Sequence, residues 1–253
     1  MSTSFSDTTN KKGLVQLCES WCSFSDGDIS GNATLLAKFT AWMNLGLDDI
    51  WAAILQASGL WQLDDSNYTD YPFITTNLVS GQRDYSFVTD GSGNVILDIY
   101  RVMIADSTGV YREIYPVDIQ KVTELTGNAV DTTSFIDGQN ASGTPTRYDK
   151  TGNSIFLDVV PNYNQTNGLK VFINREASYF KTTDTDKKPG FAGLFQTYPA
   201  LYASELYAGI KSLSNLKKLT LDKTTMRRSV EEYYCKRAKD TPNRLIANTE
   251  NNR

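Results

Sequence analysis

The chain has 253 residues, of which 40% are hydrophobic, and a formal net charge of −4. This length suits one large domain or two small ones, and the apolar content is sufficient for a buried core. The sequence contains no histidine, which excludes Ser-His-Asp and Cys-His nucleophiles, histidine metal ligands and imidazole as a general acid or base. We therefore expect a protein that is not an enzyme and that holds no cofactor or metal ion.

Neither a membrane span nor a signal peptide is predicted. No apolar run approaches the roughly 18 residues that a bilayer-spanning helix needs, and the first residues lack an apolar segment. We expect a cytosol-like compartment and no membrane partner. The cysteines are Cys18, Cys22 and Cys235. The first two are spaced for one helix face, so structural thiols are favoured over a zinc site.

The beginning of the chain has helical spacing. Leu14, Leu17, Cys18, Trp21 and Cys22 form an apolar stripe, which predicts a short helix over 13–22. A polar loop follows. Asn32 is the expected N-cap of a long helix that runs to about Ser58, with Gly59 as its C-cap.

After residue 72 the apolar spacing changes from a helical period to alternation, which is typical of β-strands. The predicted strands cover residues 73–79, 84–88, 94–105, 109–117, 145–149, 153–160 and 168–174. Residues 118–127 could form a short helix, and 128–143 are expected to form a long exposed loop. Because turn residues separate the strands closely, we expect an antiparallel β-sandwich or small barrel.

Helical spacing returns at 194–210, breaks near 212–215, and continues from Leu219 to about Lys239 before a polar tail. The predicted fold class is therefore α+β: a helical bundle made by both ends of the chain, with an inserted antiparallel β-sandwich or small barrel. Residues 1–70 are expected to form the N-terminal helices of the bundle, and residues 71–180 the all-β insert. Residues 181–240 would supply the C-terminal helices, and residues 241–253 an extended tail.

Three short constellations could carry chemistry. Asp26, Asp28, Ser30, Gly31 and Asn32 imitate the start of a calcium loop, but Ala37 stands where the bidentate glutamate belongs, so a polar loop is favoured. Asp64, Asp65 and Asp70 could supply a catalytic carboxylate pair, but a solvated turn is favoured because adjacent extended residues point apart. The DGSGN run at 90–94 lacks a following helix, which favours a hairpin over a phosphate site.

Charge is divided unevenly along the chain. The net charge is −6 over residues 1–70, −4 over 71–180 and +6 over 181–253. The basic segment 211–239 could bind nucleic acid, but its interspersed acidic residues favour a solvated helix or a protein interface. An acidic and a basic end on one chain would suit head-to-tail contacts between subunits, which close into a ring.

Four segments carry a family resemblance: ILQASGLWQLDDSNYTDYPFITTNLVSGQRDYSF (54–87), YDKTGNSIFL (148–157), PGFAGLF (189–195) and VEEYYCKRAKDTPNRL (230–245). In these segments the chain resembles the head-to-tail adaptor proteins, or tail accessory proteins, of tailed bacteriophages. The resemblance implies a ring of twelve subunits that docks on the portal and extends the DNA channel. It also implies a C-terminal segment that wraps onto the portal.

The leading hypothesis is thus a structural connector of the virion, assembled in the host bacterial cytoplasm. Its expected partners are other copies of itself, the portal protein, a downstream tail or tail-hub protein, and DNA that passes through the lumen without specific binding. The alternatives are a peptidoglycan-degrading tail accessory enzyme and a DNA-binding packaging protein. The residues expected to bind the portal are Lys236, Arg237, Lys239, Arg244, Leu245 and Ile246. The alternative for this segment is a frayed terminus without function.

Overall fold

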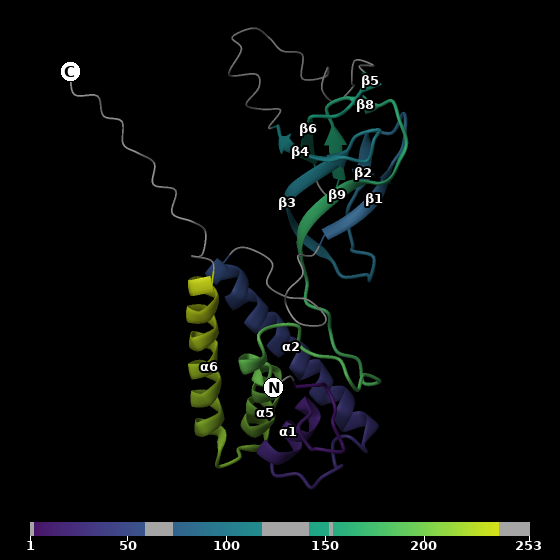
Figure 1. Ribbon diagram of the computed structural model, residues 1–253. Coiled ribbons are helices and arrows are strands. Elements are labelled where there is room, and N and C mark those ends of the chain that lie inside the picture. Colours follow the sequence, from purple (N-terminus) through teal and green to yellow (C-terminus); the bar gives the residue numbers. More distant parts are fainter. Residues whose placement is uncertain (1–2, 59–72, 118–141, 152–153, 238–253) are drawn as a thin grey trace, which may run out of the picture. The chain divides into compact units, whose positions relative to one another are not determined.

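The computed structural model describes residues 3–58, 73–117, 142–151 and 154–237, and the fold is mixed α and β (Figure 1). The chain divides into two compact units. A helical unit contains Met1–Tyr68 and Ser178–Arg253, and a β-unit contains Thr69–Ala177. The chain therefore enters and leaves the β-unit once.

The helical unit begins with α1 (Leu14–Trp21) and α2 (Ala33–Ser58). Leu14 and Cys18 of α1 are buried, as the apolar stripe predicts. The Asn32 side-chain oxygen accepts hydrogen bonds from the backbone N–H groups of Thr34 and Leu35, both at 3.1 Å. Asn32 is thus the N-cap, as predicted. The expected C-cap, Gly59, lies outside the described residues.

The second half of the helical unit contains a short 3-10 turn η1 (Gly193–Phe195), α5 (Tyr198–Lys211) and α6 (Leu216–Arg237). Ser212 ends α5 in the left-handed conformation at φ 53°, and its N–H bonds to the carbonyl of Gly209. This turn confirms the predicted break between two helices. The last helix begins at Leu216, three residues before its predicted start, because Leu216 and its neighbours also form helical backbone bonds.

Helices α2, α5 and α6 pack against one another, and α1 packs mainly on α5. Their shared core includes the fully buried side chains Leu14, Phe39, Met43, Ile50, Ile54, Tyr198, Val230 and Tyr234. Gly46 allows α2 and α5 to approach closely, since a Cβ there would lie 2.9 Å from Cβ of Tyr202. The N-terminal residues join this core through Phe5, whose N–H donates to the carbonyl of Lys187 at 2.7 Å.

The β-unit contains strands β1 to β9. The predicted alternation is clear in β7, whose second and fourth residues are buried, and it is irregular in β1. Their bounds are β1 Phe73–Leu78, β2 Asp84–Ser86, β3 Ile96–Ala105, β4 Tyr111–Pro116, β5 Ser142–Gly143, β6 Arg147–Thr151, β7 Ser154–Leu157, β8 Val160–Pro161 and β9 Gln165–Arg175. Seven strands form one sheet in the order β1-β9-β3-β4-β6-β7-β2, and β5 pairs with β8. The single run predicted at 153–160 is two strands, β7 and β8.

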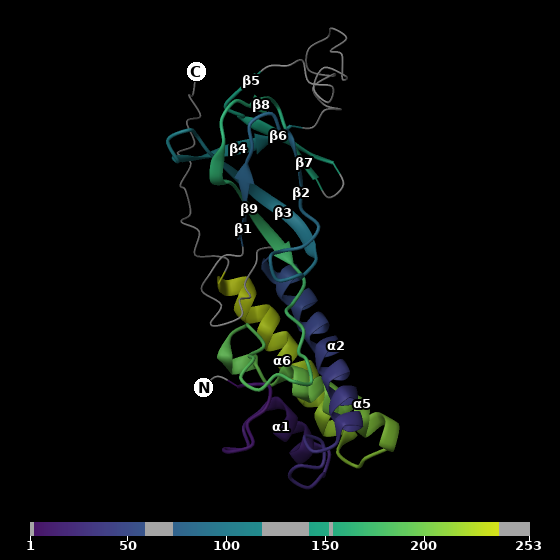
Figure 2. The ribbon, with the colours of Figure 1, turned by 90° about the vertical axis from the view of Figure 1, so that its right-hand side faces the viewer.

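The seven-stranded sheet is curled (Figure 2). Its pairs are antiparallel except β4 with β6, which are parallel. The described residues therefore form a curled open sheet with mixed pairing, and the expected wholly antiparallel sandwich or closed barrel is not shown. The structure differs from the expectation in how β6 pairs. Strand β4 ends at Pro116, and Arg147 of β6 pairs with Tyr115 of β4 in the parallel direction. A parallel pair needs a long connection between its strands.

One face of the sheet holds the core of the β-unit. The buried residues are Leu78, Tyr85, Phe87, Ile99, Val102, Ile104, Ile114, Tyr148, Ile155, Leu157, Leu169, Val171 and Ile173. Alternate residues of β9, namely Leu169, Val171 and Ile173, face this core. The predicted helix 118–127 and nearly all of the predicted loop 128–143 lie outside the described residues, and only Ser142 and Gly143 are seen, as β5.

Candidate functional site

Helix α6 carries the described portion of the predicted portal-binding segment. Lys236 is exposed in its last turn, and Arg237 is its last residue. Both stand at the carbonyl end of the helix, where positive charge is favourable. The other four predicted residues, Lys239, Arg244, Leu245 and Ile246, lie outside the described residues. The structure thus locates where this segment starts, at the end of α6.

The exposed residues of α6 carry charges of both signs and two large apolar side chains. They include the cations Lys217, Lys218, Arg228 and Lys236 and the acids Asp222 and Glu232, and Leu221 and Tyr233 are 66% and 37% exposed. Hydroxyl groups on the same helix donate to carbonyl groups four residues earlier, as Thr224 does to Thr220 at 2.8 Å. A surface of this kind can contact a protein partner through charge and apolar area.

The inward face of α6 is fixed by a polar cluster between three helices. Arg227 Nη1 lies 2.8 Å from Oδ1 of Asp49 in α2, and Arg227 Nε lies 3.3 Å from Oε1 of Glu231. The hydroxyl group of Tyr198, in α5, donates to Oδ2 of Asp49. Each Asp49 oxygen therefore has a partner, so this carboxylate joins α2, α5 and α6.

Tyr198 is fully buried at the centre of this cluster. Burial raises the pKa of its hydroxyl group, and the hydrogen bond to Asp49 and the negative charge of Asp49 raise it further. The phenol therefore stays protonated and donates to Asp49. A second pair, Lys223 with Glu205, joins α6 to α5, and the ammonium lies 5.0 Å from the ring centre of Tyr202. These contacts join α6 to α2 and α5.

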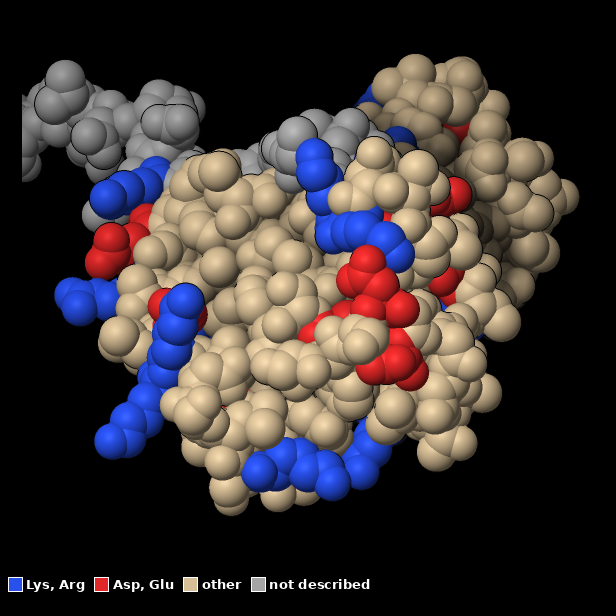
Figure 3. Space-filling model, turned by 90° about the horizontal axis from the view of Figure 1, so that it is seen from below, with Lys and Arg blue, Asp and Glu red and all other residues tan. Residues whose placement is uncertain are grey.

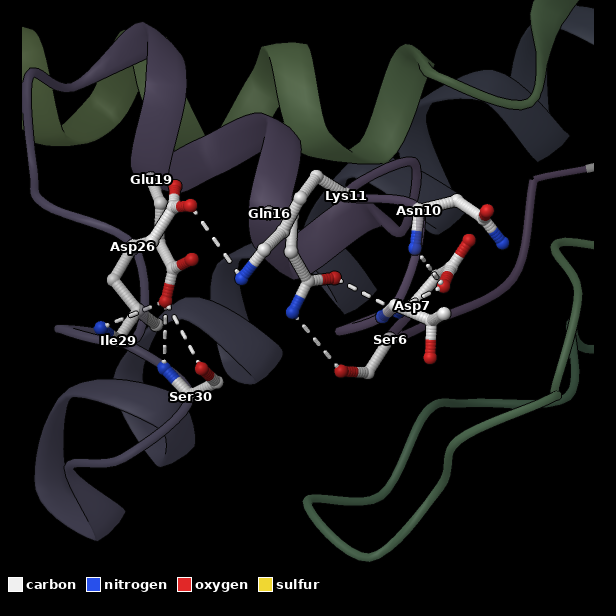
Figure 4. A network of polar contacts seen from close by, with 10 residues as sticks. Ser6, Asp7, Asn10, Lys11, Gln16, Glu19, Asp26, Ile29 and Ser30 are labelled. Atoms are coloured by element: carbon white, nitrogen blue, oxygen red, sulfur yellow. Dashed lines mark hydrogen bonds and ion pairs between the residues drawn. The ribbon is translucent and has the colours of Figure 1, made fainter.

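The calcium-like loop is organised by a buried glutamate from α1. Glu19 is 1% exposed, and its Oε1 accepts from Ile29 N, Ser30 N and Ser30 Oγ at 3.0, 2.9 and 3.1 Å (Figure 4). Asp28 accepts from the backbone N–H of Ser25, and Asp26 pairs with Lys11 at 3.5 Å. No group of three potential metal ligands occurs within the described ranges. The loop's carboxylates serve its own backbone and a surface ion pair.

Two other candidate sites came from the sequence, the glycine-rich run at 90–94 and the carboxylates Asp64, Asp65 and Asp70. The run at 90–94 is a hairpin turn closed by the bridge between Thr89 and Val95, as predicted. Burial would raise the pKa of Asp90, but hydrogen bonds from Asn94 and Ser92 and the charge of Arg175 outweigh it and hold that pKa below its ordinary value. Asp64, Asp65 and Asp70 lie outside the described residues.

The cysteines divide into two buried thiols and one exposed thiol. Burial raises the pKa of Cys22 to about 11, and it raises that of Cys18 further. The Cys18 thiol lies 3.6 Å from the carbonyl oxygen of Ala200, and the Cys22 thiol lies 3.9 Å from that of Ser204. Cys18 and Cys22 are therefore packing residues between α1 and α5, as the spacing predicts. Cys235 is exposed on α6.

The β-unit contains a cavity of about 580 Å³ beside β4 and β6. Arg112, Glu113, Tyr115 and Arg147 contribute to its lining, together with Asp106. A hydrogen bond from the hydroxyl group of Thr108 lowers the pKa of Asp106, and backbone bonds from Val110 and Thr108 lower it further. This carboxylate is therefore held by its own turn. Segment 118–141, which connects β4 to β5, lies outside the described residues.

Charged side chains of both signs lie on the face seen in Figure 3. Several acidic groups form a patch that basic groups adjoin, and further acidic and basic groups are spread over the same face. A surface with both signs in different places can contact a second copy of itself through opposite charges.

The comparisons with known proteins add no family. The chain matches no protein-family model, and no curated protein is significantly similar to it. No helix within the described residues combines the length and apolar character of a membrane span.

Sequence reasoning missed the two residues that organise the helical unit, Asp49 and Glu19. Asp49 sits beside Asp48 in the sequence, and nothing in the local pattern separates the carboxylate at the helix interface from the exposed one. Glu19 follows a buried residue, Cys18, but its partners are at least ten residues away.

Proposed function

We propose that this chain is a structural subunit of a head-to-tail connector ring in a tailed phage. In this proposal, helices from both ends of the chain form a bundle that is the ring body, and the inserted β-unit is a separate module. The subunit docks under the portal, contacts a downstream tail protein and surrounds DNA without reading its sequence. It acts at the head–tail junction of the virion without catalysing a reaction.

The observation that carries the proposal is the two-sided character of α6. Its inward face is tied to α2 through Arg227 and Asp49 and to α5 through Lys223 and Glu205. Its exposed residues include cations, acids and Leu221, and its last turn leads to the segment that resembles the family's portal-binding arm. A helix that is fixed in its bundle and ends in Lys236 and Arg237 suits the start of a segment that binds a partner protein.

The test measures recruitment to purified portal rings. Deleting residues 241–253 should weaken binding at least about tenfold, since the apolar anchors Leu245 and Ile246 are lost and roughly 1.4 kcal/mol corresponds to that factor. The thermal unfolding temperature should stay unchanged. If the truncated chain binds equally well, the contact comes from the helices between Phe191 and Lys239.

Charge reversal at the two ends of α6 gives a matched comparison. Lys236→Glu together with Arg237→Glu should weaken portal binding, because these cations begin the arm. Lys217→Glu together with Lys218→Glu changes the same charge at the opposite end of the helix. Equal effects from the two variants would show that the overall charge, and not the arm, controls binding.

The free subunit is expected to be largely monomeric. The polar sequences of the tail and of residues 128–143 favour ordering only in the assembled ring, because contacts made there would offset the entropy that ordering costs. Light scattering at micromolar concentration measures this directly. A stable dodecamer without portal would contradict the expectation.

A further inference from the structure

Strand β4 has an edge that no described strand covers along its first part. On one side, β4 pairs with β3 from Tyr111 to Ile114. On the other side, its pairing with β6 begins only at Tyr115, which lies opposite Arg147. Among the described residues, β4 is therefore paired on one side only between Tyr111 and Ile114, and at about 3.3 Å per residue this edge is about 13 Å long.

Two hydrogen bonds fix which backbone groups of β4 point to the open side. The N–H group of Tyr115 donates to the carbonyl oxygen of Thr146 at 3.3 Å, so it points toward β6. The carbonyl oxygen of Val110 instead accepts a hydrogen bond at 3.0 Å from the residue that follows β3. Successive residues of a strand direct their backbone groups to opposite sides. Counting from either bond, the N–H and carbonyl groups of Tyr111 and Glu113 point away from β3, where no described residue pairs with them.

The cavity of about 580 Å³ lies along this open edge. Its lining includes both Glu113, which is exposed, and Ile114, which belongs to the core of the β-unit. Neighbouring residues of a strand point to opposite faces of the sheet, so a cavity that both of them line lies at the strand edge. Thr144 and Pro145, which precede β6, also line it. The cavity thus occupies the place beside β4 where a further strand would lie.

The charges around the cavity leave one cation without an opposite charge. Glu113 pairs with Arg101 at 3.0 Å. Asp106 pairs with Arg112 at 3.6 Å. Arg147 is exposed and lines the cavity, and it forms no ion pair with any residue that the structure describes. A carboxylate near Arg147 would therefore complete the charge pairing of this site.

We propose that the open edge of β4 binds an extended segment of a partner protein, which adds a strand beside Tyr111–Ile114 and places a carboxylate at Arg147. The main-chain groups of Tyr111 and Glu113 exchange hydrogen bonds with the segment and supply affinity for any extended chain. The carboxylate supplies the selectivity. An uncovered strand edge is a template for aggregation, so covering it also protects the protein.

A partner protein is a better source of this segment than the described strands of a second copy. Every described strand is already held in one of the two sheets. A strand of a second copy would bring its own sheet into a cavity that has room for a single chain. The site lies in the β-unit, so the inference goes beyond the connector function and does not depend on it.

Amide hydrogen exchange at single residues tests the edge, because neighbouring residues of β4 are controls for one another. Arg112 and Ile114 donate to β3 by the same alternation and should exchange slowly in the free protein. Tyr111 and Glu113 should exchange at least about tenfold faster. The probes are the blocked peptides Ac-SVTVSVD-NH2 and Ac-DVSVTVS-NH2, which carry one carboxylate at either end and so cover both chain directions.

At about 10 mM peptide, a complex with a Kd of about 1 mM is nine-tenths occupied. Exchange at Tyr111 and Glu113 should then slow about tenfold, while exchange at Arg112 and Ile114 stays unchanged. Methylation of the valine nitrogens removes main-chain donors from the peptide and should abolish this protection. The mode of binding is thus tested separately from its charge.

Variants of β6 test the carboxylate. Arg147→Gln should weaken binding of the acidic peptide about threefold. Lys150→Gln is the matched control, because Lys150 lies on the same strand, does not line the cavity and pairs with Asp98; it should leave the affinity unchanged. Arg147→Glu should bind Ac-SVTVSVK-NH2 more tightly than the acidic peptide. Unfolding midpoints of the three variants identify any loss of folding.

Each outcome supports or overturns the proposal. Slow exchange of Tyr111 and Glu113 in the free protein would overturn it, and would assign the edge to a second copy if dilution removed the protection and to the same chain if it did not. No protection by either acidic peptide, or equal protection by the methylated peptide, would overturn strand addition. Equal binding of the acidic and lysine peptides to the unaltered chain would overturn the role of Arg147. Recruitment to portal rings enters none of these measurements, so the connector proposal is tested independently.

Discussion

Replacing Asp49 by alanine should destabilise the helical unit far more than the same change at its neighbour Asp48. Asp49→Ala leaves the hydroxyl group of fully buried Tyr198 without its acceptor, which costs about 1–3 kcal/mol of unfolding free energy. It also removes the ion pair with Arg227, in which the Arg227 and Asp49 side chains are 38% and 24% exposed. Because solvent screens a pair of this kind, it contributes about 0.5–1 kcal/mol.

The better helix propensity of alanine offsets up to about 0.7 kcal/mol of this loss. The net cost is then about 1–4 kcal/mol. At roughly 2–4 °C per kcal/mol for a unit of this size, the thermal midpoint should fall by roughly 2–16 °C. Circular dichroism at a helix-sensitive wavelength measures this midpoint.

Asp48→Ala is the matched control. Asp48 is exposed, and it accepts a hydrogen bond at 2.7 Å from the hydroxyl group of Tyr179, which is also solvent-accessible. This variant should change the unfolding free energy by less than about 0.5 kcal/mol. In a double-mutant cycle, Asp49→Ala and Tyr198→Phe should couple by about 1–2 kcal/mol. Equal midpoints for Asp48→Ala and Asp49→Ala would refute the assigned role of the cluster.

Three further predictions concern helix packing, the loop that Glu19 organises, and pH. Gly46→Ala should destabilise the helical unit by about 1–3 kcal/mol in urea unfolding, because the new Cβ meets Tyr202 at 2.9 Å. Gly209→Ala is the control: its nearest contact is at 4.0 Å, so it should stabilise α5 by up to about 1 kcal/mol. Glu19→Ala should cost about 2–3 kcal/mol, since three donors lose their acceptor, whereas Asp28→Ala, with one exposed backbone bond, should cost less than about 1 kcal/mol; similar urea midpoints would contradict this. The pKa of Tyr198 is raised in the folded state, so its contribution to stability is complete below the unfolded value of 10.0 and is lost as pH rises above it; the stability difference between the unaltered chain and Tyr198→Phe should shrink above that pH, and a constant difference would contradict the shift.

The sequence by itself determined most of the secondary structure of the described residues. The apolar stripe predicted α1 to within one residue at each end, and Asn32 marked the start of α2 because a side-chain oxygen at that position can accept from the first free N–H groups. The hairpin at 90–94 also followed from local turn chemistry. These features depend on residues within a few positions of one another, and such interactions can be read in order along the chain.

The tertiary structure alone decided the sheet order and the groups that join the helices. The pairing of β4 with β6 is parallel, and the direction of a strand relative to its neighbour cannot be read from alternation in the sequence. Asp49 and Tyr198 are 149 residues apart, and Arg227 lies 178 residues after Asp49. Aspartates 48 and 49 are equivalent in local pattern, and only the packing of α5 and α6 on one side of α2 made Asp49 a half-buried acceptor and left Asp48 in water.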